Sequence, residues 1–295
     1  MKVDLCMWTL NGAKTLKPVL ERINKVIPEC VVGQRLIVDD GSTDETIKIA
    51  KACGWRVIRN EGKGISDGAN TALKHVETEC FCSFEQDLLL SPKWWKSMIK
   101  HIQPKNVAAV SGIRHHYPSE SMRLLHEYTA ERYVNWARGL PAYLGTHARL
   151  KSAMSWGRTL DNTIYKTEIM KEIGGFPKLP VSGGVDTVLT WRIINAGYVW
   201  NVDFQIVSLH LNKTFVNELK CQFFYGSCWD AIWCEVPSLP VNLFTAVTRF
   251  LFSPLSSIHP VLVKRCPAIM VAYPLVRLQV LRGLIDSRKK RRCKC

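Results

Sequence analysis

The chain has 295 residues, of which 47% are hydrophobic and 22% are charged, which excludes a wholly disordered protein and fits one large domain or one domain with an appendage. Forty lysines and arginines against 25 acidic residues give a formal net charge of +15. A surplus of this size predicts an anionic partner: a nucleotide, a nucleic acid or an anionic membrane surface.

Short apolar runs alternate with helical patterns through the first 113 residues. Ser42 and Glu45 have the spacing of a capping box for the second helix. Alternation of this kind indicates a mostly parallel sheet with helices on both faces, an α/β fold. We expect strands at 3–8, 36–38, 57–58, 81–84 and 107–110, and helices at 16–27, 43–53, 67–76 and 92–102.

The regular alternation weakens after residue 113. The C-terminal third is apolar, aromatic and interrupted by prolines, so we expect short helices there. These patterns predict an α/β domain at 1–211 and a helical extension at 212–295. Within the first domain we expect a helix at 119–137, a loop-rich stretch at 140–158, strands at 162–165 and 199–211, and helices at 168–173 and 186–196.

Polar side chains follow the first two predicted strands. Thr9 and Asn11 come after the first strand, and the adjacent acids Asp39 and Asp40 end the second. In open α/β sheets, ligands bind at the carboxyl ends of the strands. Two carboxylates at a buried edge are costly unless they bind hydroxyls, amides or a metal ion. This edge therefore predicts a binding site.

Two further acidic motifs lie at element ends. Glu85-Gln86-Asp87 follows the apolar run 81–84, and two carboxylates one residue apart can both approach one divalent ion. Such hard oxygen ligands suit magnesium or manganese, with phosphate oxygens in the remaining positions. Asp186 stands at the start of an amphipathic helix, where an aspartate by itself most often caps the helix.

Taken together, these elements resemble glycosyltransferase family 2. Val-Asp-Asp-Gly-Ser-Thr-Asp-Glu-Thr at 38–46 is similar to the nucleotide-binding signature of that family. The resemblance extends over roughly residues 3 to 211. Further matches are the Asn/Gly-rich loop at 59–64 with Asn70, the Gly-Gly-Phe element at 173–176, Asp186 with Arg192 and 196–198, and His210 after the next strand.

The resemblance implies the GT-A fold, a Rossmann-like sheet that binds a nucleotide sugar, and an inverting transfer of the sugar. Asp186 would be the catalytic base that takes the proton from the acceptor hydroxyl. Asp87, with Glu85 and His210, would hold manganese or magnesium on the diphosphate. The donor would be a UDP- or GDP-linked sugar. The residues implied for binding it are Thr9, Asn11, Asp39, Asp40, Lys63, Asn70, Glu85 and Gln86.

The sequence also departs from the family pattern. Glu85 replaces the first aspartate of the Asp-x-Asp motif, and Val185 replaces the glutamate before Asp186. The Gln-x-x-Arg-Trp motif of processive members is not apparent, which favours transfer of a single sugar. Two alternatives therefore stay open. One is a degenerate, non-catalytic fold that acts as a basic membrane or nucleic-acid adaptor, and the other is a nucleotidyltransferase, for which the loop at 11–14 is a poor match.

The C-terminal segment permits two interpretations. Apolar residues from Phe244 to Leu255 and from Val276 to Leu284 form helical faces that basic residues interrupt. These helices either pack on the catalytic domain or lie on a lipid surface, with the basic tail at 288–295 near anionic headgroups. Many members of the family act on polyprenyl-phosphate or other membrane-bound acceptors, so the acceptor would be such a lipid or a glycan.

The sequence shows neither a signal peptide nor a segment with the 18 uncharged apolar residues of a spanning helix. The eleven cysteines have no paired or zinc-binding spacing, so reduced thiols are expected. No motif for nucleic-acid binding accompanies the basic charge, and we expect no nucleic-acid partner. These features predict a cytoplasmic protein, with a peripheral position on the cytoplasmic face of a membrane as the alternative.

Overall fold

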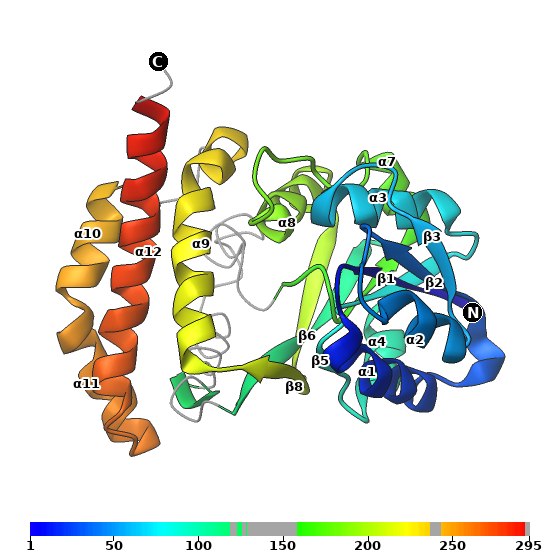
Figure 1. The fold of residues 1–295 in the computed structure, drawn as a ribbon, viewed down its shortest axis with the longest axis horizontal. Helices are drawn as coiled ribbons and strands as arrows, with labels where there is room; N and C mark the ends of the chain where they lie inside the picture. Colours follow the sequence, from blue (N-terminus) through cyan, green and yellow to red (C-terminus); the bar gives the residue numbers. More distant parts are fainter. Residues whose placement is uncertain (119–122, 126–127, 129–157, 237–242, 293–295) are drawn as a thin grey trace. The chain divides into compact units, whose positions relative to one another are not determined.

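The computed structural model describes residues 1–118, 123–125, 128, 158–236 and 243–292. The predicted loop at 140–158 and most of the predicted helix at 119–137 lie outside the described residues. The chain divides into two compact units (Figure 1). The first comprises 1–115, 155–178 and 185–211, and the second comprises 116–154, 179–184 and 212–295. The predicted domain boundary at 211 is thus one of several places where the chain passes between the units.

One mixed sheet of eight strands runs through the structure, in the order β3-β2-β1-β4-β7-β6-β8-β5. Each predicted strand is present, and β6 and β8 are longer than expected. The two-residue β5 is too short for any periodicity to indicate it. The strands are β1 Val3–Thr9, β2 Val32–Asp39, β3 Arg56–Arg59, β4 Cys80–Phe84, β5 Leu88–Leu89, β6 Val107–Pro118, β7 Thr163–Lys166 and β8 Val199–Lys213.

The expected parallel pairing holds for one half of the sheet. There β1 pairs with β2 and β4, and β2 pairs with β3, all in parallel. In the other half β7 pairs antiparallel with β4 and β6, and β5 pairs antiparallel with β8. The alternation of strands and helices stops after β6, so the crossover connections that enforce parallel strands stop there too.

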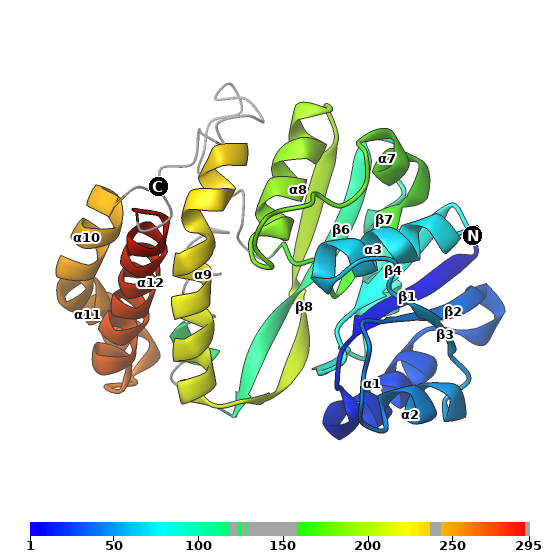
Figure 2. The ribbon, with the colours of Figure 1, turned by 45° about the horizontal axis from the view of Figure 1, so that its top comes forward.

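Helices cover both faces of the sheet (Figures 1 and 2). The core on one face joins Val3, Leu5 and Met7 of β1 to α1 and to Trp94 and Met98 of α4. These three β1 side chains share a face because strand side chains alternate. The helices of this first unit are α1 Ala13–Val26, α2 Thr46–Ala52, α3 Gly64–His75, α4 Trp94–His101, α7 Thr167–Glu172 and α8 Val185–Asn195, with the short 3-10 helix η1 Glu29–Val31.

The capping box predicted from Ser42 and Glu45 is wrong. Helix α2 begins at Thr46, and Glu45 stands before it without a side-chain cap. The Ser42 hydroxyl donates instead to Asp39, at 2.5 Å, and the Thr46 backbone N–H donates to Asp44, at 3.0 Å. Because Ser42 Oγ also accepts the Asn11 N–H, at 2.9 Å, the hydroxyl bonds the neighbouring loops and does not cap the helix.

The second unit contains two long helices as well as the short ones expected. Helix α9 has 21 residues and α12 has 24, while α10 and α11 have nine and twelve. In both views α12 lies between α9 and the pair α10 and α11 (Figures 1 and 2). The helices are α9 Phe215–Glu235, α10 Leu243–Leu251, α11 Ser253–Lys264 and α12 Ile269–Arg292.

Among the described helices, no single one is long and apolar enough to cross a membrane. Helices α10 and α11 meet the length and composition criteria only when they are taken together, and they are bent by 54° at their junction.

Candidate active site

The loops that follow β1, β2 and β4 leave the same edge of the sheet. In the register of the parallel strands, Thr9 lies opposite Asp39, and Met7 lies opposite Phe84. Neighbouring strands are about 4.8 Å apart, so Asp39 and the end of β4 are separated by about 10 Å across β1. The structure therefore brings the predicted strand-end residues to one edge.

Asp39 and Asp40 both build the loop at this edge. The Asp39 carboxylate accepts the backbone N–H groups of Gly41 and Ser42, at 2.9 and 2.8 Å. Asp40 accepts the Asn60 amide at 2.8 Å and the Gly64 N–H at 3.0 Å. Amide donors from the chain itself thus offset part of the free-energy cost of removing these two carboxylates from water. Asp39 Oδ1 and both carboxylate oxygens of Asp40 each keep a lone pair for a ligand.

Thr9, Asn11 and Gln86 hold the neighbouring loops together. The Thr9 hydroxyl donates to Gln86 Oε1 at 2.6 Å, and the Gln86 amide donates back to the carbonyl of Leu10. Asn11 has a φ of 50°; its N–H donates to Ser42 Oγ and its Oδ1 accepts the Thr43 N–H, both at 2.9 Å. These three side chains hold the loops after β1, β2 and β4 in place at the edge of the sheet where a ligand would bind.

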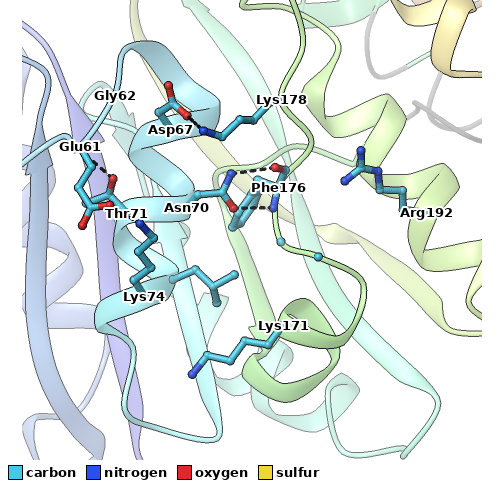
Figure 3. A pocket seen from close by; sticks show the side chains of 13 residues that line it. Glu61, Gly62, Asp67, Asn70, Thr71, Lys74, Lys171, Phe176, Lys178 and Arg192 are labelled. Carbon is cyan, nitrogen blue, oxygen red and sulfur yellow. Dashed lines mark hydrogen bonds and ion pairs between the residues drawn. The ribbon is translucent and has the colours of Figure 1, made fainter.

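Lys63 stands at the start of α3, where its backbone N–H donates to Asp67 at 3.0 Å. Its side chain is exposed. The predicted Asn70 lies about two helical turns further along α3, and both atoms of its amide bond the Phe176 backbone: Nδ2 donates to the carbonyl of Phe176 and Oδ1 accepts the Phe176 N–H, at 2.8 and 2.9 Å (Figure 3). This clamp ties α3 to the Gly-Gly-Phe element.

Asn70 lines a recess between α3 and the Gly-Gly-Phe element (Figure 3). The recess is open and has a volume of about 770 Å³. Its charged groups include the ion pair of Lys178 with Asp67, at 2.6 Å, and the pair of Lys74 with Glu61. Of the residues predicted for the site, Asn70 alone is among those that line it.

The residues Glu85, Asp87 and His210 form a compact acidic cluster. The antiparallel pairing of β5 with β8 places Leu88 opposite His210, and the Leu211 N–H donates to the carbonyl of Asp87 at 2.7 Å. His210 Nε2 lies 3.1 Å from Glu85, and Nδ1 lies 3.3 Å from Asp87. One ligand atom from each of the three residues lies within 4.8 Å of the others.

This cluster fits a divalent ion by its chemistry. Two carboxylates and one imidazole nitrogen converge on one point, and the two acids are only about two-thirds buried, so they are open to solvent. Oxygen-rich sets of this kind suit manganese and magnesium. Glu85 takes the position of the usual aspartate and still reaches the cluster, so its longer side chain does not prevent a shared site.

Two residues that the sequence analysis missed complete the cluster. Arg114 extends from β6 and donates to Glu85 at 3.2 Å and to Asp161 at 3.3 Å. Asp161 is buried, and its pKa is raised to about 7, mainly by burial and then by the charge of Glu85, while Arg114 and His210 oppose the rise. Neither residue belongs to a recognisable motif, so no local sequence signal could have identified them.

Asp186 is the second residue of α8, and its carboxylate accepts the Thr187 N–H at 2.8 Å. Burial raises its pKa above the ordinary value, and the charge of Arg114 acts in the opposite direction. Arg114 contacts Glu85 and Asp161 directly, and its charge also acts on the pKa of Asp186. Val185, where the family has glutamate, is buried.

Comparisons with known proteins identify the family of the chain. A model of the family described as Glycosyl transferase family 2 matches residues 4–174. The chain is also 24% identical over 240 residues to the protein named Glycosyltransferase AglE from Haloferax volcanii, which covers 78% of this chain and 74% of that protein.

Two solved structures share the fold. Mannosyltransferase PcManGT from Pyrobaculum calidifontis, in complex with GDP-Man and Mn²⁺, matches with a TM-score of 0.63 at 15% identity, over 98% of this chain and 87% of its own. Glucosyl-3-phosphoglycerate synthase from Mycobacterium tuberculosis, in complex with Mg²⁺ and UDP, matches with a TM-score of 0.58 at 15% identity, over 82% of this chain and 81% of its own.

Proposed function

Since the chain belongs to glycosyltransferase family 2 and has its GT-A fold, we propose that it transfers a single sugar from a nucleotide-diphosphate donor, with inversion, to an acceptor hydroxyl or phosphate. The observation that carries this proposal is the convergence of Glu85, Asp87 and His210 at the strand edge, where Arg114 contacts Glu85. The departures at Glu85 and Val185 leave both the metal-binding cluster and the base candidate in place.

The donor lies along the edge formed by β1, β2 and β4. Asp39, Asp40 and the loop held by Asn11 receive the nucleoside, while Lys63 offers a cation at the start of α3. Glu85, Asp87 and His210 hold the divalent ion. When bound, manganese or magnesium neutralises the charge that develops on the leaving diphosphate. The related structures with GDP-Man and Mn²⁺ and with UDP and Mg²⁺ support a donor of this class.

Asp186 acts as the general base. Burial raises the pKa of Asp186, and a carboxylate with a raised pKa is a better proton acceptor than an ordinary aspartate, while the charge of Arg114 opposes the rise. Once Asp186 takes its proton, the acceptor oxygen attacks the anomeric carbon from the face opposite the diphosphate. Attack from that side inverts the configuration.

The acceptor is a glycan or a polyprenyl-phosphate lipid, and the chain acts at the cytoplasmic face of a membrane. The missing Gln-x-x-Arg-Trp motif supports transfer of one sugar in preference to polymerisation. Helices α10 and α11 support a membrane-bound acceptor because they expose large apolar side chains and contain no acidic residue.

The test of this function is the substitution Asp186→Asn. It keeps the size of the side chain and its acceptance of the Thr187 N–H, but it removes the base. We expect transfer to fall by a factor of about 10² to 10⁴. Binding of UDP or GDP with manganese, followed as a rise in melting temperature, should persist. Full transfer activity in this variant would remove Asp186 from its role.

The same melting assay on the wild-type chain separates the alternatives. A glycosyltransferase predicts saturable binding of UDP or GDP that requires manganese or magnesium. A non-catalytic adaptor predicts no metal-dependent binding of either nucleotide. Asp87→Asn should abolish the increase in nucleotide binding that manganese or magnesium produces. Asp67→Asn is the matched control: it lies on α3 at the recess, and its nucleotide binding should still depend on the metal.

A further inference from the structure

The outer face of α10 and α11 exposes an unusual number of large apolar side chains. Phe244, Leu255 and Leu262 are 74%, 66% and 70% exposed. More than half of the exposed large apolar side chains that the structure describes lie between residues 244 and 271. We call this surface the apolar outer face. It consists of Phe244, Leu251, Phe252, Leu255, Ile258, Leu262 and Val263, with Met270 and Val271 at the start of α12.

These side chains are not needed for packing within the second unit. The opposite side of α10 contributes Ala246, Val247 and Phe250 to a cluster with Leu281 and Leu284 of α12. Val261 of α11 packs on a second cluster around α12. One side of α10 and α11 thus packs on α12 within the second unit, and the other is covered by nothing that the structure describes.

The segment of the chain that carries the apolar outer face contains charged side chains of one sign only. Residues 236–285 contain no aspartate or glutamate, yet they include five lysines and arginines. Lys264 and Arg265 stand at the end of α11, next to Leu262 and Val263, and Arg265 is exposed. An apolar face bordered by cations, without a single acid in 50 residues, matches the interface of a bilayer with anionic headgroups.

The shape of the two helices favours a position in the plane of the membrane. Helix α10 has nine residues and α11 has twelve, so at 1.5 Å per residue each is well below the roughly 30 Å of the hydrocarbon core, and only the two in line would reach that length. Their junction is bent by 54°. Two short, bent helices with one apolar side each can lie flat at the boundary between headgroups and acyl chains.

We propose that the apolar outer face of α10 and α11 binds the surface of a membrane that contains anionic lipid, with Lys264 and Arg265 at the headgroups. This inference deepens the proposed function: the benefit of membrane binding for reaching a lipid acceptor rests on that function. The binding itself depends on these helices alone. It would hold the catalytic unit where a polyprenyl-phosphate acceptor is available.

The experiment is flotation of the full-length chain with vesicles, without donor or metal. Vesicles of phosphatidylcholine alone are compared with vesicles that also contain phosphatidylglycerol. We expect the wild type to float with the anionic vesicles and to bind them less at high salt. The double variant Leu255→Gln/Leu262→Gln should bind the vesicles at least about tenfold more weakly than the wild type, because two exposed leucines no longer enter the bilayer.

Two further variants make the test specific. Lys264→Gln/Arg265→Gln should lose the preference for anionic vesicles while it keeps residual binding through the apolar side chains. Val216→Gln replaces an apolar side chain of α9 that is 60% exposed and lies outside the apolar outer face, and it should bind like the wild type. Leu255, Leu262, Arg265 and Val216 are exposed and Lys264 is half-buried, so far-ultraviolet circular dichroism and melting are measured for each variant and are expected to match the wild type.

Three results would overturn the inference: no flotation of the wild type, equal flotation of Leu255→Gln/Leu262→Gln, or a dimer of the wild type that this variant dissolves while neither binds vesicles. The last result would mean that a second copy of the chain covers the face. Because nucleotide binding with manganese is measured separately, failure of flotation would leave the proposed catalytic chemistry standing, and failure of nucleotide binding would leave the membrane inference standing.

Discussion

At the residue scale, the charge balance of the candidate site depends on Arg114. Its guanidinium contacts Glu85 and Asp161, and its charge lowers the pKa of both Asp161 and Asp186. Arg114 is itself mostly buried, with 19% of its side chain exposed. One cation thus offsets several acids in a region where burial would otherwise favour their protonated forms.

Asp161 should make the stability of the metal-free chain depend on pH. Its pKa is raised to about 7 in the folded state, against roughly 3.9 in the unfolded chain. A raised pKa means that the folded state holds the proton more tightly. The resulting stabilisation is complete below the unfolded pKa and is lost as the pH rises through about 7.

We therefore expect the wild type, in the presence of a chelator, to lose up to about 3 kcal/mol of unfolding free energy between about pH 5 and pH 8 through this group. Asp161→Asn cannot ionise and should lose less over the same range. Urea unfolding at several pH values measures the difference. Parallel pH profiles for the two proteins would show that Asp161 does not carry this dependence.

Some site residues were predictable from sequence because their positions follow from the strand pattern. Thr9, Asp39 and Glu85 lie at strand ends, and the sheet brings them to one edge. The contacts of Asn70 were not predictable: nothing in its motif indicates that both of its amide atoms bind the Phe176 backbone. A motif identifies a residue but does not distinguish binding a ligand from holding a loop.

At the element scale, the sequence predicts well the helices that have one apolar side. Helix α1 has such a side and was expected at nearly its observed length. Helix α12 is different because it packs on α9 in one direction and on α10 and α11 in another. Its apolar residues therefore surround the helix, and Pro274 lies inside it, so the pattern suggested several short helices where one long helix forms.

The packing of α9 on α12 depends on two glycines. A Cβ atom at Gly226 would overlap the backbone carbonyl of Val280, and one at Gly283 would overlap the backbone of Phe223. Neither obstacle is a flexible side chain, so the helices could admit a methyl group only by moving apart. Close backbone approach at small residues is what allows the long contact between these helices.

Gly226→Ala should consequently destabilise the protein, although alanine is the better helix former by about 1 kcal/mol. We expect a net loss of about 1–3 kcal/mol of unfolding free energy from overpacking. Lys220→Ala, at an exposed position of the same helix, is the matched control and should change stability by less than about 0.5 kcal/mol. A Gly226→Ala variant as stable as the control would contradict the close contact.

At the scale of the whole molecule, the chain passes between the two units several times, and one passage lies immediately before Asp186. Residues 179–184 belong to the second unit, and the first unit resumes at Val185. Within the second unit, Gly183 lies against Phe224 and Cys228 of α9, and Gly184 lies against Ile232. The loop at 179–184, which leads to the proposed base, is thus supported by α9. Strand and helix patterns along the sequence give no indication that this loop packs on α9.

Gly184 is where this support can be tested. Its φ is 84°, a value that non-glycine residues rarely adopt, and a Cβ there would overlap the side chain of Ile232. Gly184→Ala should strain the loop by about 1–2 kcal/mol and displace Asp186. We expect kcat to fall several-fold, while binding of UDP or GDP with manganese stays as in the wild type because Glu85, Asp87 and His210 are untouched.

The double variant Gly184→Ala/Ile232→Ala separates steric overlap from backbone strain. Removing the Ile232 side chain makes room for the new methyl group, so part of the lost kcat should return relative to Gly184→Ala if the overlap displaces the loop. The single variant Ile232→Ala supplies the reference for the cavity that this substitution leaves. If Gly184→Ala weakened nucleotide binding as much as it lowered kcat, the loop at 179–184 would support the donor-binding residues and not the base. The inference that this loop positions Asp186 would then be wrong.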